Sequence, residues 1–342
     1  MRSLLLDGVS RRVWIALGVT LAVLLIAPLI VNDYLLTILI LILYFAYTAQ
    51  AWNIMMGFAG QLSLGHALYV GLGAYTTAAL YVHFGLSPWL GLPVAVIVSA
   101  LTGACIGFLA FRFRVAGVYF AILTIAFAEF ARIGFDHFGW VNGSSGLFLP
   151  VANYTQSDLW NLRGKPVMFY YVLLFFTVAA LALCHALLRS RAGYFWQAIR
   201  EDEEAARSLG IDTFRYKMYA VVLSAGMTSV AGVFFAFYYN NLFPEQVFSI
   251  SRSVELILAP VIGGVGTLIG PIVGAFLLTG LAEVIWEFLN AFGFDPPGAK
   301  QVFYGICLLF VVVLLPDGVW PPLSRALGLA ERPDAPDDKP EA

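Results

Sequence analysis

Long runs of apolar residues, separated by short polar or charged stretches, make up most of this chain. A helix needs about 20 consecutive apolar residues to cross the hydrocarbon core of a membrane. The pattern therefore predicts an all-α polytopic membrane protein whose transmembrane domain covers residues 13–316. We expect ten transmembrane helices, over residues 13–31, 34–56, 59–83, 89–110, 117–138, 168–188, 218–239, 253–269, 271–290 and 300–315.

Composition agrees with this pattern. Apolar residues make up 61% of the chain, charged residues 12%, and the mean hydropathy is +0.84. Soluble domains carry about 45–50% apolar and about 25% charged residues, so a soluble, disordered or fibrous protein is excluded. Cys105, Cys184 and Cys307 all lie inside apolar runs, which favours packing roles over a disulfide or a metal site. The net charge of −2, without a basic cluster, argues against a nucleic-acid partner.

The positions of Lys and Arg predict the orientation of the chain. With a cytoplasmic N-terminus, fourteen of these residues lie inside, four lie outside, and Arg132 lies in the fifth span. Residues 1–12 and a partly disordered tail, 317–342, are then cytoplasmic. Residues 139–167 form an outer loop and residues 189–217 an inner loop. We expect a multi-pass protein of a bacterial-type inner membrane.

The inner loop is the most charged part of the chain. Residues 194–209 predict an amphipathic helix with Glu203 and Arg207 paired at i,i+4 and Gly210 as the stop. Such a helix suits either a membrane interface or docking to a partner protein. Its apolar side is expected to hold Phe195, Trp196, Ile199, Ala206 and Leu209.

Two glycine-rich segments, residues 57–67 and 263–271, share the pattern Gly-x-x-Gly-x-Leu. Glycine weakens a helix by about 1 kcal/mol relative to alanine, and small residues also allow helices to pack closely. Each segment is therefore either a close-packing site or a broken helix with free backbone groups. In the first segment Gln61, Ser63 and His66 add polar groups that need partners.

The fifth span carries Glu129 and Arg132, three positions apart on one helix face. A carboxylate inside a span is expensive and marks a candidate functional residue. Two interpretations remain open at this point. The two side chains neutralise each other, or Glu129 contacts the solute.

Four motifs occur along the chain: residues 60–66 (Gly-Gln-Leu-Ser-Leu-Gly-His), the run from Gly117 to Glu129, residues 142–147 (Asn-Gly-Ser-Ser-Gly-Leu) and residues 204–210 (Glu-Ala-Ala-x-x-x-Gly). Together they resemble the branched-chain amino acid permease family of ABC importers. The first looks like the family signature and the third like its outer-loop motif. The second resembles the M-type rather than the H-type of the family's two paired permeases. The fourth resembles the first half of the cytoplasmic coupling motif, whose second half is absent here.

The resemblance implies a heterodimer of two permeases, two cytoplasmic ATP-binding subunits and an extracytoplasmic solute-binding protein. Neither enzymatic activity nor a cofactor is expected of this chain, because it contains no Gly-x-x-x-x-Gly-Lys-Ser/Thr phosphate loop; ATP and Mg²⁺ belong on the partner ATPase. The expected substrate path contains Gly57, Gly60, Gln61, Ser63, Gly65, His66, Tyr119, Thr124 and Glu129. The expected ATPase-coupling residues are Arg200, Glu201, Glu204, Ala205, Ala206 and Gly210.

Other functions remain as alternatives. The solute is a branched-chain or related small amino acid, or instead urea or a short amide. An ion-coupled secondary transporter would use intramembrane acids, here Glu129, Glu255, Glu283 and Glu287. An intramembrane serine protease would use Ser145 with His66 or His185, although an outer-loop serine and inner-end histidines lie about 30 Å apart across a bilayer.

Overall fold

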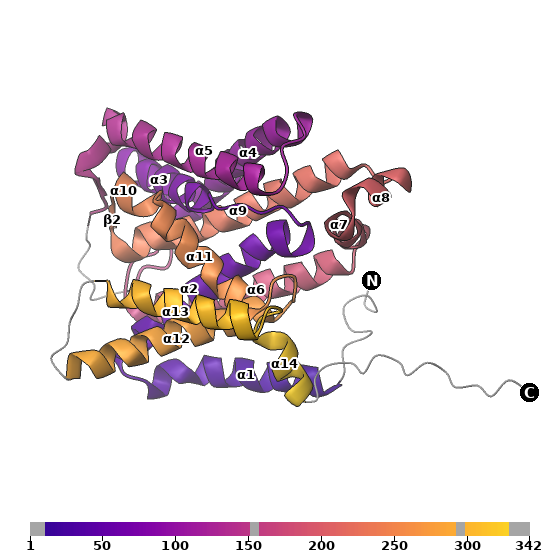
Figure 1. The fold of residues 1–342 in the computed structure, drawn as a ribbon. Coiled ribbons are helices and arrows are strands. Elements are labelled where there is room, and N and C mark those ends of the chain that lie inside the picture. Colours follow the sequence, from indigo (N-terminus) through magenta and orange to yellow (C-terminus); the bar gives the residue numbers. More distant parts are fainter. Residues whose placement is uncertain (1–10, 151–156, 292–297, 328–342) are drawn as a thin grey trace, which may run out of the picture.

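The computed structural model describes residues 11–150, 157–291 and 298–327, and these fold into a helical bundle (Figure 1). Short non-α elements join the helices: η2 (Ile54–Phe58), a π-helical turn; η3 (Gly139–Val141) and η4 (Gly143–Ser145), both 3₁₀ turns; and strands β1 (Leu147–Phe148) and β2 (Asn241–Leu242). The α-helices are α1 (Arg11–Ile30), α2 (Asp33–Asn53), α3 (Ala67–Phe84), α4 (Pro88–Arg112), α5 (Val118–His137), α6 (Pro166–Leu188), α7 (Arg191–Glu201), α8 (Glu203–Ser208), α9 (Thr213–Tyr239), α10 (Pro244–Val247), α11 (Ile250–Gly263), α12 (Gly270–Ala291), α13 (Ala299–Leu314) and α14 (Trp320–Ala326).

Within the described ranges, six helical segments are long and apolar enough to cross a membrane. They are α2 with its π turn, α4, α5, α6, α9, and α10 together with α11. Shorter apolar helices cover residues 18–30, 270–285 and 302–311. A mostly helical membrane protein, the coarser part of the prediction, is therefore confirmed. The count of ten spans and the cytoplasmic location of both termini stay predictions.

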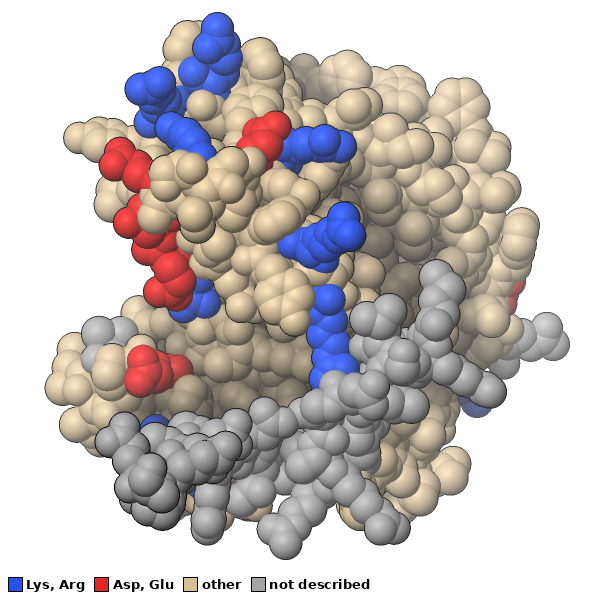
Figure 2. All heavy atoms as spheres, turned by 90° about the vertical axis from the view of Figure 1, so that its right-hand side faces the viewer, with Lys and Arg blue, Asp and Glu red and all other residues tan. Residues whose placement is uncertain are grey.

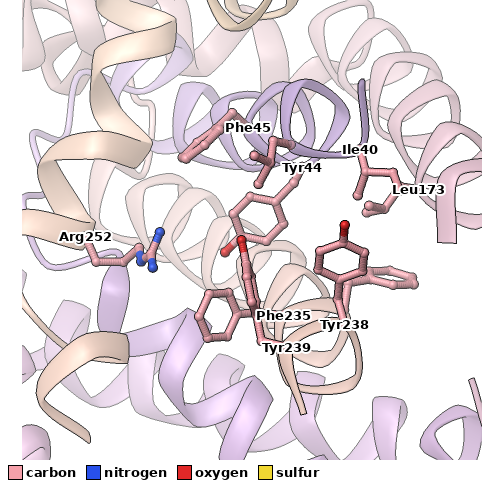
Figure 3. A pocket seen from close by; sticks show the side chains of 10 residues that line it. Ile40, Tyr44, Phe45, Leu173, Phe235, Tyr238, Tyr239 and Arg252 are labelled. Carbon is pink, nitrogen blue, oxygen red and sulfur yellow. The ribbon is translucent and has the colours of Figure 1, made fainter. Parts of the chain in front are cut away.

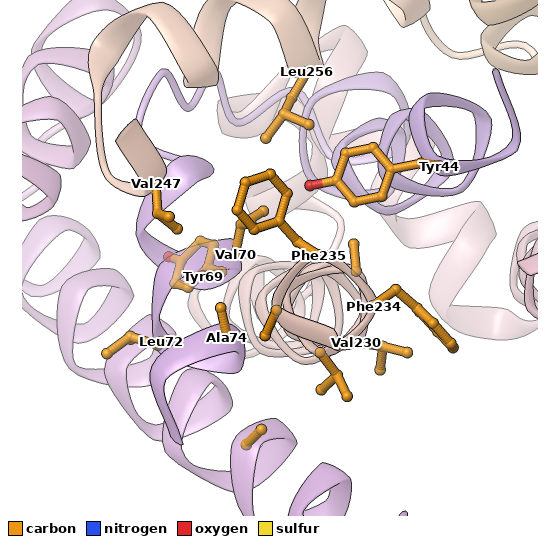
Figure 4. Close-up of a cluster of buried hydrophobic side chains, with 14 of the residues drawn as sticks. Tyr44, Tyr69, Val70, Leu72, Ala74, Val230, Phe234, Phe235, Val247 and Leu256 are labelled. Atoms are coloured by element: carbon orange, nitrogen blue, oxygen red, sulfur yellow. The ribbon is translucent and has the colours of Figure 1, made fainter. Parts of the chain in front are cut away.

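Helix α9 forms the centre of the bundle, with 83% of its most apolar stretch buried, compared with 22% for α5. Figure 4 shows Phe235 of α9 beside Tyr44 of α2 and Leu256 of α11. Helices α3 and α9 touch through their backbones, since a Cβ on Gly73 would lie 2.0 Å from the carbonyl oxygen of Ser229. Small residues thus allow the close helix packing typical of membrane bundles.

The structure corrects the predicted third and eighth spans at their glycine-rich ends. Helix α3 begins only at Ala67, so residues 59–66 are not helical; Gly60 has a φ of +69°. Helix α11 ends at Gly263, and Gly264 and Gly266 that follow have positive φ values of +125° and +82°. Both segments are thus broken helices, one of the two alternatives that the sequence left open.

The predicted inner helix over residues 194–209 is also wrong in one respect, because it breaks into α7 and α8 at Asp202. One carboxylate oxygen of Asp202 accepts hydrogen bonds from the backbone N–H groups of Glu204 (2.9 Å) and Ala205 (3.0 Å). This is an N-cap, which starts a new helix. Asp202 itself has the extended backbone of a capping residue.

Three further features concern the loops and the tail. Strands β1 and β2, which the sequence did not predict, pair antiparallel with Leu147 opposite Leu242. Helix α14 lies within the segment predicted as a tail, and the backbone N–H of Val319 donates to the carbonyl of Ile262 at 2.9 Å. The N-terminal residues before Arg11, part of the outer loop (151–156) and the Pro- and Asp-rich end lie outside the described residues.

Candidate functional site

The two glycine-rich segments meet at the end of α2. The amide of Asn53 accepts a hydrogen bond from the backbone N–H of Gly266 at 2.8 Å and donates one to the carbonyl of Thr267 at 2.9 Å. Gln50, one turn earlier, donates to the carbonyl of Leu268 at 2.7 Å. These bonds satisfy backbone groups that the break after α11 leaves free. Sequence reasoning missed both amides, although a polar side chain inside an apolar run was a signal for them.

Gly57 lies where this contact is tightest. A Cβ at Gly57 would lie 1.9 Å from Oδ1 of Asn53 and 2.7 Å from the backbone nitrogen of Gly266. No side chain fits at that distance without moving a backbone. Close approach, rather than flexibility, is therefore the reason for glycine here.

His66 belongs to a closed hydrogen-bond network inside the bundle. The hydroxyl of Ser224 donates to the carbonyl of Ala51 at 2.7 Å, so it accepts from Nε2 of His66 at 3.0 Å. With a proton on Nε2, Nδ1 of His66 accepts from the hydroxyl of Ser63, also at 3.0 Å. Ser63, His66 and Ser224 are all less than 2% exposed. The histidine is neutral and fully partnered, which suits a structural role.

Thr124 ties the first glycine-rich segment to α5. Its hydroxyl accepts from the backbone N–H of Leu64 at 3.1 Å and donates to the carbonyl of Ala121 at 2.7 Å. A Cβ on Gly65 would lie 2.2 Å from the carbonyl oxygen of Thr124. Gln61 turns back and donates to the carbonyl of Ala59 at 2.9 Å.

The predicted path residues therefore fall into two groups. The buried group holds the first glycine-rich segment together through internal hydrogen bonds and close contacts, and its place in a solute path stays a prediction. The second group, Tyr119 and Glu129, lies on the outer surface of α5. The buried group comprises Gly57, Gln61, Ser63, Gly65, His66 and Thr124, with Gly60 partly buried beside them.

Glu129 is paired, as one of the two sequence interpretations expected. Nε of Arg132 donates to both carboxylate oxygens of Glu129, at 2.9 and 3.0 Å, and Nη2 donates to one of them at 2.6 Å. Arg132 also pairs through Nη1 with Asp136 at 2.9 Å, a partner that the sequence analysis did not identify. These three side chains, the α5 triad, are between 20% and 40% exposed. The three side chains are therefore accessible at the surface of this chain.

Two hollows differ in what they can hold. The first, drawn in Figure 3, has a volume of about 20 Å³ and is lined by aromatic side chains and Arg252. That volume admits one water but no amino acid. The buried hydroxyl of Tyr44 has no protein partner in the described part of the chain, which suits such a water. The second, about 480 Å³, is an open surface hollow beside Tyr119 and Arg114.

The loop over residues 189–217 is firmly attached to the membrane helices. Trp196 of α7 is fully buried and donates from Nε1 to the carbonyl of Tyr216 at 2.7 Å. The ammonium of Lys217 lies 2.7 Å from Glu203 of α8, and Arg207 pairs with the same carboxylate at 3.0 Å, as predicted. The pair α7–α8 is thus a fixed element at one end of the bundle, and we call it the α7–α8 element.

Gly210 ends α8 as predicted, with a φ of +87°. The backbone N–H of Ile211 donates to Ala206 and that of Gly210 to Arg207, the pattern of a Schellman motif. The expected apolar side is wrong for Leu209, which is 81% exposed. Ala206, expected to contact a partner, is only 2% exposed and faces its own chain.

The outward surface of the α7–α8 element is rich in charge. Figure 2 shows this end of the molecule, where basic and acidic side chains gather on an otherwise uncharged surface. Its exposed residues include Arg200, Glu201, Asp202, Glu204, Ala205, Arg207 and Leu209. Arg200 is exposed in part only, because its Nη1 donates to the carbonyl of Gly57.

The residues that a serine protease or an ion-coupled transporter would use are engaged in other contacts. Both ring nitrogens of His66 bond to Ser63 and Ser224, so His66 is not the base of Ser145 as a protease would need. Glu255, one of the acids that a secondary transporter would use, pairs with Arg252 at 3.0 Å. Within the described ranges, no three His, Cys, Asp or Glu side chains gather closely enough to hold a metal ion.

Comparisons with known proteins agree with the motifs. Residues 34–312 match the family described as branched-chain amino acid transport system / permease component. The high-affinity branched-chain amino acid transport system permease protein LivM of Salmonella typhimurium is 32% identical over 290 residues. That match covers 79% of this chain and 66% of the relative, just under two thirds of its length.

Two other relatives match less closely. The corresponding LivH protein of Escherichia coli is 25% identical over 292 residues, which cover 80% of this chain and 90% of the relative. The autoinducer 2 import system permease protein LsrC of an Enterobacter species is 28% identical over 246 residues, covering 69% and 67%. No solved structure matches the chain.

Proposed function

The chain belongs to the family of branched-chain amino acid transport system permease components, and from that membership we propose that it is one permease subunit of an ATP-driven importer. It is a multi-pass protein of the bacterial inner membrane. Its partners are a second permease, two cytoplasmic ATP-binding subunits and an extracytoplasmic solute-binding protein. ATP and Mg²⁺ bind to the ATPase subunits, and this chain provides the path.

The α7–α8 element is the observation that carries the proposal. Its inner side is fixed by the buried Trp196 and by the pair of Lys217 with Glu203. Its outer side presents Leu209 and several carboxylates. A surface that is ordered before binding loses little entropy when a partner docks. A secondary transporter has no use for such an element, whereas an importer driven by a separate ATPase needs one.

The α5 triad supports a second permease as neighbour. Helix α5 is the least buried of the six long spans, yet Glu129, Arg132 and Asp136 remain partly exposed on it. A charged side chain at the centre of a helix facing lipid costs about 2.5–3.5 kcal/mol. We propose that α5 faces the second permease and borders the path between the two subunits.

The triad also suits the solute. A free amino acid is a zwitterion, and the triad offers two carboxylates for its ammonium group and one guanidinium for its carboxylate. Tyr119, 76% exposed on the same helix, lies about 15 Å from Glu129 along the helix axis, so it would meet the solute at a different point of the path. The expected solutes are leucine, isoleucine and valine, with urea and short amides as the alternative.

Reconstitution in lipid vesicles tests the proposal. The four partner chains and this one are reconstituted together, and uptake is measured for leucine, isoleucine, valine, urea and a short amide. Uptake of at least one amino acid should require both ATP and the solute-binding protein. Uptake by this chain alone, driven by a proton or sodium gradient, would replace the proposal with secondary transport.

A further inference from the structure

Arg200, in the last turn of α7, contacts both glycine-rich segments at once. Its Nη1 donates to the carbonyl of Gly57 in the π turn that ends α2. A Cβ on Gly266 would lie 2.0 Å from the same nitrogen, and a Cβ on Gly60 would lie 3.2 Å from Cα of Arg200. The arginine therefore lies in the crease between the two segments.

Asn53 also contacts the second glycine-rich segment, at Gly266. It holds the backbone of Gly266 at 2.8 Å, and a Cβ on Gly266 would also lie 2.9 Å from the carbonyl oxygen of Gly57. The last carbonyls of a helix lack partners within the helix, and an arginine can supply the missing donor. We call the four residues Asn53, Gly57, Arg200 and Gly266 the glycine joint. The ends of α2, α7 and α11 converge on it.

The joint lies next to the surface where an ATPase would dock. Only Glu201 separates Arg200 from Asp202, the N-cap of α8. Helix α8 follows α7 after the single residue Asp202, so it cannot shift far without carrying the end of α7 with it. Contacts as tight as those at Gly57 and Gly266 leave no free space to absorb such a shift.

We infer that Arg200 is a positioning residue that transmits movement of the α7–α8 element to the inner ends of α2 and α11. This inference rests on the proposed function and goes beyond it in one respect. The sequence analysis expected Arg200 as an ATPase contact; the residue is exposed on the α7–α8 element, and in addition Nη1 of its guanidinium bonds to the glycine joint. Arg200 therefore acts after docking, on the membrane helices.

The test uses the complete importer and compares Arg200→Met with Arg112→Met. Arg112 is an exposed arginine at the end of α4, outside the α7–α8 element, so it controls for lost charge. For each complex three quantities are measured: ATPase retained on purification, ATP hydrolysis, and solute transported per ATP hydrolysed. In Arg200→Met the ATPase should be retained and ATP hydrolysed, while transport per ATP falls about tenfold or more, the scale of one lost charge-assisted hydrogen bond. Arg112→Met should match the wild type.

Two more variants keep the inference falsifiable if Arg200→Met folds poorly. Gly266→Ala leaves Arg200 in place but displaces its guanidinium, so it should uncouple in the same way. Arg200→Lys keeps one donor and should partly restore transport per ATP. Loss of the ATPase from the Arg200→Met complex, or coupled transport in Gly266→Ala, would overturn the inference. Failure of the proposed function is recognised separately, because the wild-type complex itself would then not transport with ATP.

Discussion

The ammonium of Lys217 lies 2.7 and 2.9 Å from the two carboxylate oxygens of Glu203, so one ion pair fastens α8 to the start of α9. The two partners differ in burial: the side chain of Lys217 is 7% exposed and that of Glu203 is 28% exposed. Lys217 also lies 4.6 Å from the centre of the Phe111 ring. The pair is thus partly buried, so replacing Glu203 and replacing Lys217 should destabilise the folded protein to different extents.

Glu203→Gln should destabilise the protein more than Lys217→Met. The first change leaves the buried lysine without a counter-ion, at a cost on the order of 3 kcal/mol. The second leaves Glu203 with Arg207 as a remaining partner. Thermal unfolding midpoints in detergent measure the order, with Glu204→Gln, an exposed neighbour, as the control. Equal midpoints for the three variants would show that the pair does not fasten α8.

Docking of the ATPase should depend on Ala205 rather than on Ala206. Ala205 is exposed, so Ala205→Trp should block docking sterically while the membrane helices stay intact. Ala206 is 2% exposed, and Ala206→Trp should instead unfold the α7–α8 element by overpacking, at about 1–3 kcal/mol or more. Co-purification of the ATPase and limited proteolysis of residues 189–217 separate the two effects. Retention of the ATPase by Ala205→Trp would show that the ATPase docks on a surface that does not include Ala205.

Within the α5 triad, Arg132→Met should reduce folded yield more than Glu129→Gln does. Removing the arginine leaves two carboxylates unpaired, whereas Glu129→Gln leaves Arg132 bonded to Asp136. If the triad serves the solute, Glu129→Gln should assemble normally and transport several-fold more slowly. Yield by size-exclusion chromatography and uptake by the reconstituted complex are the measurements. Wild-type uptake in Glu129→Gln would leave the carboxylate with a purely structural role.

The first glycine-rich segment should not tolerate a methyl group at Gly65. Gly65→Ala places a Cβ 2.2 Å from the carbonyl oxygen of Thr124 and should lower the folded yield sharply. Thr124→Val removes the acceptor for the N–H of Leu64 and should cost about 1–3 kcal/mol, whereas Thr124→Ser keeps it. Thermal unfolding checks both, and equal midpoints for Thr124→Val and Thr124→Ser would contradict the assigned hydrogen bond.

The predicted topology is tested by labelling single cysteines in a chain that lacks Cys105, Cys184 and Cys307. Leu209→Cys and Leu159→Cys both replace exposed residues, 81% and 55% accessible. A membrane-impermeant maleimide applied to intact cells should label position 159 only. Labelling of position 209 from outside would contradict the predicted orientation, because residues 189–217 would then not be cytoplasmic.

Local sequence signals predicted those parts of the structure that depend on neighbours along the chain. Apolar runs located the long helices, and the spacing of Glu129 and Arg132 predicted their pair. The same spacing rule applies to Asp136, four residues after Arg132, so the sequence could also have predicted the third member of the triad. Asp202 before two glutamates was likewise a readable N-cap signal for the break between α7 and α8.

Contacts between distant segments were beyond local reasoning. Asn53 and Gly266 lie 213 positions apart, and no periodicity in either segment specifies the other. The Gly-x-x-Gly-x-Leu pattern that the two segments share did not indicate that they touch. The burial of Ala206 and the exposure of Leu209 likewise depend on how α8 packs against the rest of the chain, which local sequence does not specify.

The α5 triad has a consequence for the life of the chain in the cell. If α5 faces a second permease, as proposed above, a copy synthesised without that subunit holds the side chains of the triad against lipid, on the least buried of the long apolar helices. Such an orphan is less stable than the assembled form, since assembly stabilises the folded state by mass action. Membrane quality-control proteases act on the less stable population. The steady-state amount of this chain would then follow the supply of its covering subunit rather than its own rate of synthesis.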